Sequence, residues 1–246
     1  MKTIFKFILK NYLKYITKIV LFIHKPIIIG VAGSLNKTFV KDEINRVLRD
    51  RGLEVRSNPR SFNTNIGLPL AILNLPSGYN SYRRWLPIIG QAFGAIFKSF
   101  PMHSVLVLEL GISDPGDAKY LFSIIKPEIV VITEVTQRYL EGFESMNELV
   151  QEYEYLVSQV PEDGLVILNN DNQRVKSLES KIKAEKVFFG FNDGADWRVR
   201  EISKNITEQI IKIEHEKNIV EYKINRFGEH HVYAKLVGLI IDKAIK

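Results

Sequence analysis

The chain of 246 residues contains no cysteine. This absence excludes disulfide bonds, thiolate metal sites and cysteine nucleophiles, and it is compatible with a reducing cytoplasm. No internal repeat and no low-complexity linker interrupts the sequence, so a repeat architecture is not indicated. Apolar content of 46% and charged content of 25% are ordinary for a globular protein, and the length suffices for a sizeable core.

The N-terminal segment lacks an uninterrupted apolar run, although residues 1–24 are rich in apolar side chains. Five lysines inside this segment argue against a membrane-spanning helix, which needs about 20 mostly apolar residues. No small-residue cleavage site marks a secretory signal. The spacing predicts a basic amphipathic helix with a lysine stripe at Lys2, Lys6, Lys10, Lys14 and Lys18.

Two interpretations of residues 1–24 stay open. The segment either lies on an anionic membrane surface or packs on its own domain or on a partner chain. Much of the net charge of +6 is concentrated in this one apolar helix. A nucleic-acid partner is therefore disfavoured, since such partners need a basic groove that carries aromatic side chains.

Continuous apolar runs predict buried parallel strands in the middle of the chain, because strands covered on both faces show no alternation. Helix-like segments alternate with these runs, which predicts an α/β fold with a mostly parallel sheet and flanking helices. The expected strands are residues 105–108, 129–132, 165–168 and 187–189, and the expected helices are residues 118–125 and 146–160.

The remaining segments are less regular. Residues 207–214 and 218–224 alternate apolar and polar side chains, which predicts an antiparallel hairpin, and residues 228–246 predict a terminal helix. A short strand is expected at residues 53–55. Glycines in the apolar stretch of residues 85–100 predict an irregular or closely packed segment.

Residues 30–38 have the form of a phosphate-binding loop between a predicted strand and a predicted helix. A glycine turn in that position directs backbone N–H groups and a helix N-terminus at an anion. Lys37 would then reach the terminal phosphates, and the Thr38 hydroxyl would bind magnesium. Asn36 stands where such loops carry glycine, and although asparagine tolerates a positive φ, its side chain predicts weakened nucleotide binding.

Four segments in order resemble the central, ATP-binding domain of the Mur ligase family. They read GVAGSLNKT at residues 30–38, FNTNIGLPL at 62–70, ELG with DPGD at 109–117, and IT with LEGFES at 132–145. The likeness is greatest to the members that add D-alanyl-D-alanine to a UDP-muramoyl tripeptide. The resemblance implies a P-loop NTPase-like domain over residues 25–246, preceded by the amphipathic helix of residues 1–24.

In that family the loop binds ATP and Mg²⁺, a carboxylate is phosphorylated, and an amine attacks the acyl phosphate to form an amide. Phosphoryl transfer of this kind depends on positioning and on charge neutralisation by lysine and metal. By resemblance, Asn63 and Asn65 lie near a UDP-muramoyl peptide substrate. The implied metal ligands are Thr38 and Glu109, and the implied nucleotide-binding residues are Gly33, Ser34, Leu35, Asn36, Lys37, Thr38 and His230.

Two residues of the family's second metal site are replaced. Tyr139 stands in place of a histidine, and a neutral phenol with a pKa of about 10 is a poor ligand. Tyr153 stands where the family has a carbamoylated lysine, with Glu152 and Glu154 as poor substitutes. We also expect the family's flanking domains to be absent, which would leave an acyl phosphate open to hydrolysis. No residue is therefore assigned a catalytic role.

Three hypotheses remain, and they differ in whether the chain is an enzyme. The first is an ATP-binding domain of the amide-ligase type that is not self-sufficient as a ligase. The second is an active ligase of peptidoglycan precursor synthesis, completed by a partner chain that supplies a C-terminal ligase domain. The third is a non-catalytic scaffold associated with the membrane. The expected location is the cytoplasm, with peripheral attachment to the inner face of the plasma membrane as the finer alternative.

Overall fold

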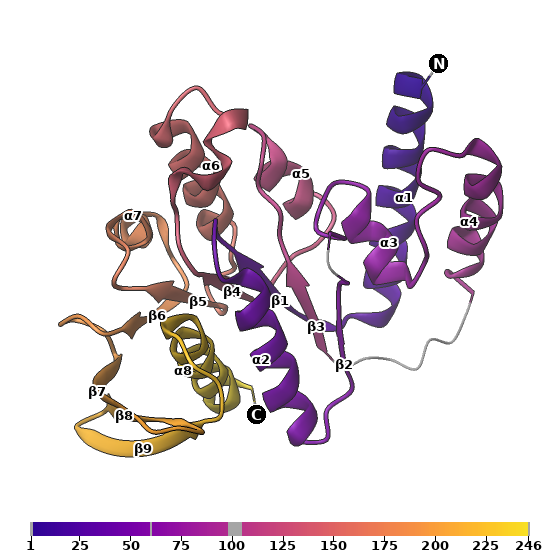
Figure 1. Ribbon diagram of the computed structural model, residues 1–246. Coiled ribbons are helices and arrows are strands. Elements are labelled where there is room, and N and C mark those ends of the chain that lie inside the picture. Colours follow the sequence, from indigo (N-terminus) through magenta and orange to yellow (C-terminus); the bar gives the residue numbers. More distant parts are fainter. Residues whose placement is uncertain (1, 60, 98–104, 246) are drawn as a thin grey trace.

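The computed structural model of the chain describes residues 2–59, 61–97 and 105–245, and these residues form a nine-stranded sheet (Figure 1). The strand order is β2-β3-β1-β4-β5-β6-β7-β8-β9. Neighbouring strands from β2 to β7 are parallel, and β7, β8 and β9 are antiparallel. The strands are β1 (Ile27–Ala32), β2 (Val55–Ser57), β3 (Val105–Glu109), β4 (Ile129–Ile132), β5 (Leu165–Asn169), β6 (Glu185–Gly190), β7 (Trp197–Lys204), β8 (Gln209–His215) and β9 (Asn218–Ile224).

Helices cover both faces of the sheet, and successive residues of β1 divide between the two layers. Ile29 and Val31 pack with α2 and α8, whereas Ile28 packs with α5, α6 and α7, as expected from the alternation of side chains along a strand. The predicted α/β class is confirmed. These elements are α2 (Lys37–Asp50), α5 (Asp117–Phe122), the 3₁₀ helix η1 (Gln137–Gly142), α6 (Met146–Ser158), α7 (Gln173–Ser177), the 3₁₀ helix η2 (Leu178–Lys181) and α8 (Glu229–Ala244).

A third group of helices stands beside the β2 edge of the sheet and consists of α1 (Lys2–His24), α3 (Gly67–Leu73) and α4 (Tyr82–Gly94) (Figure 1). Leu13 of α1 is fully buried against these neighbours, together with Trp85 of α4. The amphipathic helix therefore packs one side on its own chain. Among the described residues, no helix has the length and apolarity to cross a membrane.

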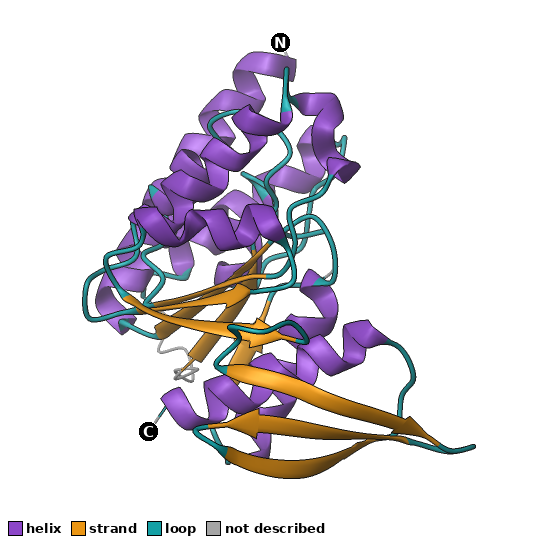
Figure 2. Cartoon of the chain, turned by 90° about the vertical axis from the view of Figure 1, so that its left-hand side faces the viewer, coloured by secondary structure: helices purple, strands orange, loops and turns teal. Residues whose placement is uncertain are grey.

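The antiparallel part of the sheet contains one strand more than predicted. The hairpin of β8 and β9 matches the expected ranges, and Figure 2 shows these strands and β7 projecting to one side of the parallel strands. Strand β7 was missed because a bulge between Val199 and Glu201 breaks its alternation, and because it joins β6 through only two residue pairs.

The segment expected to be irregular forms a regular helix over most of its length. Trp85, Ile88 and Ala92 of α4 share one buried side, which gives the helix its tertiary support. Gly90 faces open space, so it costs only its intrinsic helix propensity. Residues 98–100 of the predicted segment lie outside the described part of the chain. The short strand expected at residues 53–55 begins two residues later.

Candidate functional site

The turn after β1 is held in place by the end of β4. Strand β1 lies between β3 and β4, so this turn sits at a topological switch point, where open α/β sheets bind ligands. The Ser34 N–H donates to the Glu134 carbonyl at 2.6 Å, and the Thr133 hydroxyl donates to the Leu35 carbonyl at 2.6 Å. Gly33 has a φ of +138°, and a Cβ there would lie 2.1 Å from the Thr133 hydroxyl oxygen. Only glycine fits this position.

Helix α2 begins directly after the turn, at Lys37. Asn36 is its N-cap residue in the left-handed conformation (φ 63°, ψ 0°), and its side chain makes no capping hydrogen bond. The first N–H groups of a helix have no partner within that helix, so α2 presents donors and a positive dipole end at the turn. The asparagine is therefore tolerated by the backbone, and the geometry of an anion-binding turn is kept.

The Lys37 side chain folds back over the turn, and its ammonium donates to the Gly33 carbonyl at 2.6 Å. Only 6% of the residue is exposed. Burial lowers the pKa of Lys37, and the charge of Arg138 on η1 lowers it further, whereas Glu109 opposes both effects. The positive charge of Lys37 therefore lies at the turn, where an anionic ligand would stabilise the charged form of the side chain.

Glu109, the last residue of β3, has polar partners on α2 and in the loop before α3. The Thr38 hydroxyl donates to one of its carboxylate oxygens at 3.0 Å, and the Asn63 amide donates to the other at 3.0 Å. The Lys41 ammonium lies 3.9 Å from the first oxygen. The two predicted metal ligands, Thr38 and Glu109, are therefore adjacent.

The oxygen donors of Thr38 and Glu109 suit Mg²⁺, which commonly takes one or two protein ligands and completes its shell with water and substrate phosphates. Across residues 2–59, 61–97 and 105–245, no group of three or more histidines, aspartates or glutamates gathers that could hold a metal alone. A metal here would therefore depend on a phosphate ligand.

Two polar residues of this site were not predicted from the sequence. Asn58, just after β2, exchanges hydrogen bonds with the Glu109 backbone at 2.8 and 2.9 Å. Lys41 is only 3% exposed and donates to the Asn58 carbonyl at 2.8 Å. A sequence signal existed for Lys41, because it lies one helical turn after Lys37 and on the same side of α2.

The two predicted substrate residues have different partners. Asn63 belongs to the Glu109 cluster, whereas the Asn65 amide donates to the Asp117 carboxylate at 3.1 Å. Asp117 also accepts the N–H groups of Ser113 and Asp114 at 3.0 Å, so it closes the turn before α5. Asn65 thus contacts the turn before α5, and Asn63 contacts Glu109.

The position that the resemblance equates with a carbamoylated lysine lies in the hydrophobic core. Tyr153 is fully buried among the residues that pack under α5, α6 and α7. Glu152 accepts the N–H groups of Gly116 and Ala118 at 2.7 and 2.9 Å, so its carboxylate caps α5. Neither residue offers a free anionic ligand to the site. The side chain of Tyr139 lies outside the described part of the structure.

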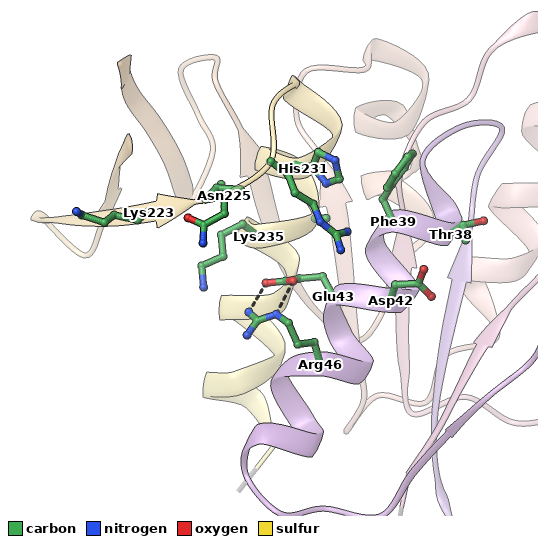
Figure 3. A pocket seen from close by; sticks show the side chains of 12 residues that line it. Thr38, Phe39, Asp42, Glu43, Arg46, Lys223, Asn225, His231 and Lys235 are labelled. Atoms are coloured by element: carbon green, nitrogen blue, oxygen red, sulfur yellow. Dashed lines mark hydrogen bonds and ion pairs between the residues drawn. The ribbon is translucent and has the colours of Figure 1, made fainter. Parts of the chain in front are cut away.

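A pocket of about 870 Å³ opens beside Thr38, between α2, α8 and the end of β9 (Figure 3). Phe39 and His231 line it, and the ring of Phe39 lies 4.4 Å from that of His230 and 5.1 Å from that of His231. Burial lowers the pKa of His231, and the neighbouring His230 and Arg226 lower it further. The ring of His230 lies against Phe39 in the first turn of α2.

The pocket walls carry more cations than anions. Glu43 is paired with Arg46, whose guanidinium donates to it at 2.6 and 2.9 Å. Burial lowers the pKa of Lys235, against the raising effect of Glu43. The remaining charged lining residues are Asp42, Lys223 and Arg226.

The sequence profile of the Mur ligase middle domain matches residues 93–241, which is more than half of the chain. The chain belongs to the Mur ligase family. A UDP-N-acetylmuramoyl-tripeptide–D-alanyl-D-alanine ligase of Buchnera aphidicola is 26% identical over 160 residues, which cover 65% of this chain and 29% of that protein. The ligase of the same name from Mycobacterium tuberculosis is 31% identical over 160 residues, with 65% and 26% covered.

Solved structures show the same fold. The MurF ligase of Thermotoga maritima, crystallised in complex with ADP, superposes with a TM-score of 0.77 at 19% identity, covering 96% of this chain and 49% of that one. The predicted resemblance is confirmed. The chain spans less than a third of the length of the Buchnera relative and about half of the length of the Thermotoga structure.

Proposed function

We propose that this chain binds ATP with Mg²⁺ and serves as the ATP-binding domain of an amide-ligase system in peptidoglycan precursor synthesis. The observation that supports this proposal best is the meeting of Lys37, Thr38 and Glu109 at the turn between β1 and α2. Phosphates would accept hydrogen bonds from the first N–H groups of α2 and from Lys37. Thr38 and Glu109 would hold Mg²⁺, which neutralises phosphate charge when bound.

The nucleoside end of the ligand would occupy the pocket beside Thr38. Phe39 lines this pocket and its ring packs against that of His230, and aromatic faces suit a base. In this arrangement Gly33, Ser34 and Leu35 surround the phosphates with backbone. The ligand-binding domain comprises residues 25–246, and residues 1–24 form an added helix.

We propose further that the chain is not self-sufficient as a ligase. The burial of Tyr153 and the capping role of Glu152 support this, because neither residue can bridge a second metal. The alternative is an active ligase completed by a partner chain, with a UDP-muramoyl peptide bound near Asn63 and Asn65. That alternative is favoured by the bond between Asn63 and Glu109, which joins the substrate side to the phosphate side. It requires phosphate release that depends on both UDP-muramoyl peptide and the partner chain.

Titration of Mg·ATP against the wild type and Lys37→Ala tests nucleotide binding directly. We expect saturable binding by the wild type and at least about tenfold weaker binding by Lys37→Ala, because a charge-assisted hydrogen bond is lost. Lys217→Ala, in the exposed turn between β8 and β9, is the matched control and should bind as the wild type does. Equal and negligible binding by all three proteins would contradict the proposal.

Replacement of Asn36 by glycine is expected to tighten Mg·ATP binding by about three- to tenfold, since glycine adopts the observed φ of 63° freely and removes a side chain from the phosphate position. Isothermal calorimetry would measure the change. Binding that is unchanged or weaker in Asn36→Gly would show that Asn36 does not crowd the ligand.

We also propose peripheral attachment to the inner face of the plasma membrane through α1, with a non-catalytic membrane-associated scaffold as the alternative function. The lysine stripe of α1 and its exposed apolar residues support this location. Deletion of residues 1–24 is a poor test, because Leu13 and its neighbours pack on α3 and α4 and their loss would disturb both helices. Substitutions on the exposed side of α1 or its neighbours avoid this problem.

A further inference from the structure

Exposed apolar side chains gather on two neighbouring helices. Ile8 and Tyr15 of α1 are 60% and 62% exposed, and Leu86 and Phe93 of α4 are 70% and 55% exposed. Apolar side chains of this size are seldom concentrated on the surface of a monomer without a function. Both helices also have a buried side, so this exposure is additional to the packing of the helices on the protein.

The two helices run side by side in the same direction (Figure 1). At one level the rings of Phe5 and Tyr82 lie 4.8 Å apart, and seven residues later on each helix the Tyr12 hydroxyl donates to the Ile89 carbonyl at 2.8 Å. Equal steps on both helices between the two contacts show that α1 and α4 are parallel and in register here.

The exposed apolar residues border this junction from both sides. On α1, Ile8 and Tyr15 each lie about one helical turn after a residue that contacts α4. On α4, Leu86 and Phe93 each lie about one helical turn after a residue that contacts α1. They therefore form one continuous area, which we call the two-helix surface. Its members are Ile4, Ile8, Tyr15 and Ile19 of α1 and Leu86 and Phe93 of α4.

The charge around the two-helix surface has one sign. The sequence contains no aspartate or glutamate in residues 1–41 or in residues 55–108, which include α1, α3 and α4. Exposed cations accompany the apolar residues, and each lysine or arginine near an anionic bilayer contributes about 1 kcal/mol to attraction. These cations are Lys18 of α1, Arg83 of α4, and Lys25 just after α1.

We propose that α1 and α4 together bind an anionic lipid bilayer through the two-helix surface. This inference rests on the proposed peripheral location and adds α4 as a second contact that the lysine stripe of α1 did not reveal. The apolar side chains enter the boundary between headgroups and acyl chains, and the cations contact lipid phosphates. A second copy of the chain is the poorer occupant, because it would bring two acid-free cationic surfaces together.

Co-sedimentation with vesicles tests the contribution of α4. The vesicles are phosphatidylcholine alone and phosphatidylcholine mixed with phosphatidylglycerol. The test variant is Leu86→Glu/Phe93→Glu. The control is Gln91→Glu, which adds a carboxylate to the side of α4 that faces away from α1, because residue 91 lies two positions after Ile89, which contacts α1. We expect the wild type to pellet with the anionic vesicles only, the double variant to partition at least about tenfold less, and Gln91→Glu to remain within about twofold of the wild type.

Three outcomes would overturn the proposal. They are equal partitioning of the double variant and Gln91→Glu, wild-type binding that is as strong to phosphatidylcholine alone, and a wild type that stays in the supernatant but forms dimers in solution. Mg·ATP titration of the same variants separates this proposal from nucleotide binding, because the Lys37 site is distant from α4 in the sequence and shares no residue with the two-helix surface. Unchanged ATP affinity with lost vesicle binding would also show that the variants are folded.

Discussion

Replacement of Gly33 by alanine is expected to abolish Mg·ATP binding and to lower the free energy of unfolding by about 3 kcal/mol. Two costs add at this position. The φ of +138° is rarely adopted by residues with a side chain, and the new Cβ would lie 2.1 Å from the Thr133 hydroxyl and 2.9 Å from the Glu134 carbonyl oxygen. The turn must open to relieve this overlap, which displaces the N-terminus of α2.

Gly52→Ala provides the matched control. Gly52 also has a positive φ, +81°, but a Cβ there would meet no atom within 4 Å, so only the backbone cost of about 1 kcal/mol is expected. Urea unfolding and ATP titration of both variants would isolate the steric part of the effect. If Gly33→Ala were no less stable than Gly52→Ala and still bound ATP, the tight packing of the turn against β4 would be contradicted.

Replacement of Tyr153 by lysine, the residue that the resemblance implies at this position, is expected to destabilise the protein by about 3–5 kcal/mol at pH 7 rather than to create a metal ligand. Tyr153 is fully buried beneath α5, α6 and α7, so the new ammonium would be removed from water in an apolar environment. Burial would lower the pKa of this lysine in the folded protein below its unfolded value of about 10.4.

The pH dependence of stability gives this prediction a signature. A lysine with a depressed folded pKa binds its proton more tightly in the unfolded chain, so the penalty is largest at neutral pH and shrinks as the pH rises toward about 10.4. Urea unfolding of Tyr153→Lys at pH 7 and pH 9.5 should therefore show rising stability relative to Tyr153→Phe, which keeps the ring. A Tyr153→Lys protein as stable as Tyr153→Phe at both pH values would mean that the position is open to solvent.

The parallel core of the fold could be predicted because its signals are local. Residues 105–108, 129–132, 165–168 and 187–189 are apolar without interruption, and each forms part of an observed strand. The same reasoning failed for β7, where the bulge after Val199 removes the period-two pattern. It also underestimated α4, whose glycines weaken the local signal while tertiary packing of Trp85 and Ile88 maintains the helix.

The candidate site was predictable in part. Lys37 and Thr38 follow from the loop pattern and Glu109 from the resemblance to the Mur ligase family, and the three residues lie close together in the structure. Asn58 could not be assigned, because an asparagine after a short strand usually faces solvent. Lys41 was not assigned either, although its spacing from Lys37 placed it on the same side of α2. Their burial becomes evident only when β2 is placed beside β3. The second apolar side of α1 likewise needed the contacts of α4 before it could be separated from the packed side.

The hydrogen bonds between the turn after β1 and the end of β4 also limit the order in which the protein can fold during its synthesis on the ribosome. Leu35 depends on a hydroxyl 98 positions later in the chain, and Ser34 on a backbone group 102 positions later. The ribosome synthesises β3 and β4, the partners of β1, much later than β1 itself. Until then β1 is an unpaired apolar segment, which chaperones can bind. A translation product that stops before residue 132 would thus contain Lys37 and Thr38 but would lack the residues that fix the turn. A nucleotide could then not bind to the turn and protect the product from degradation.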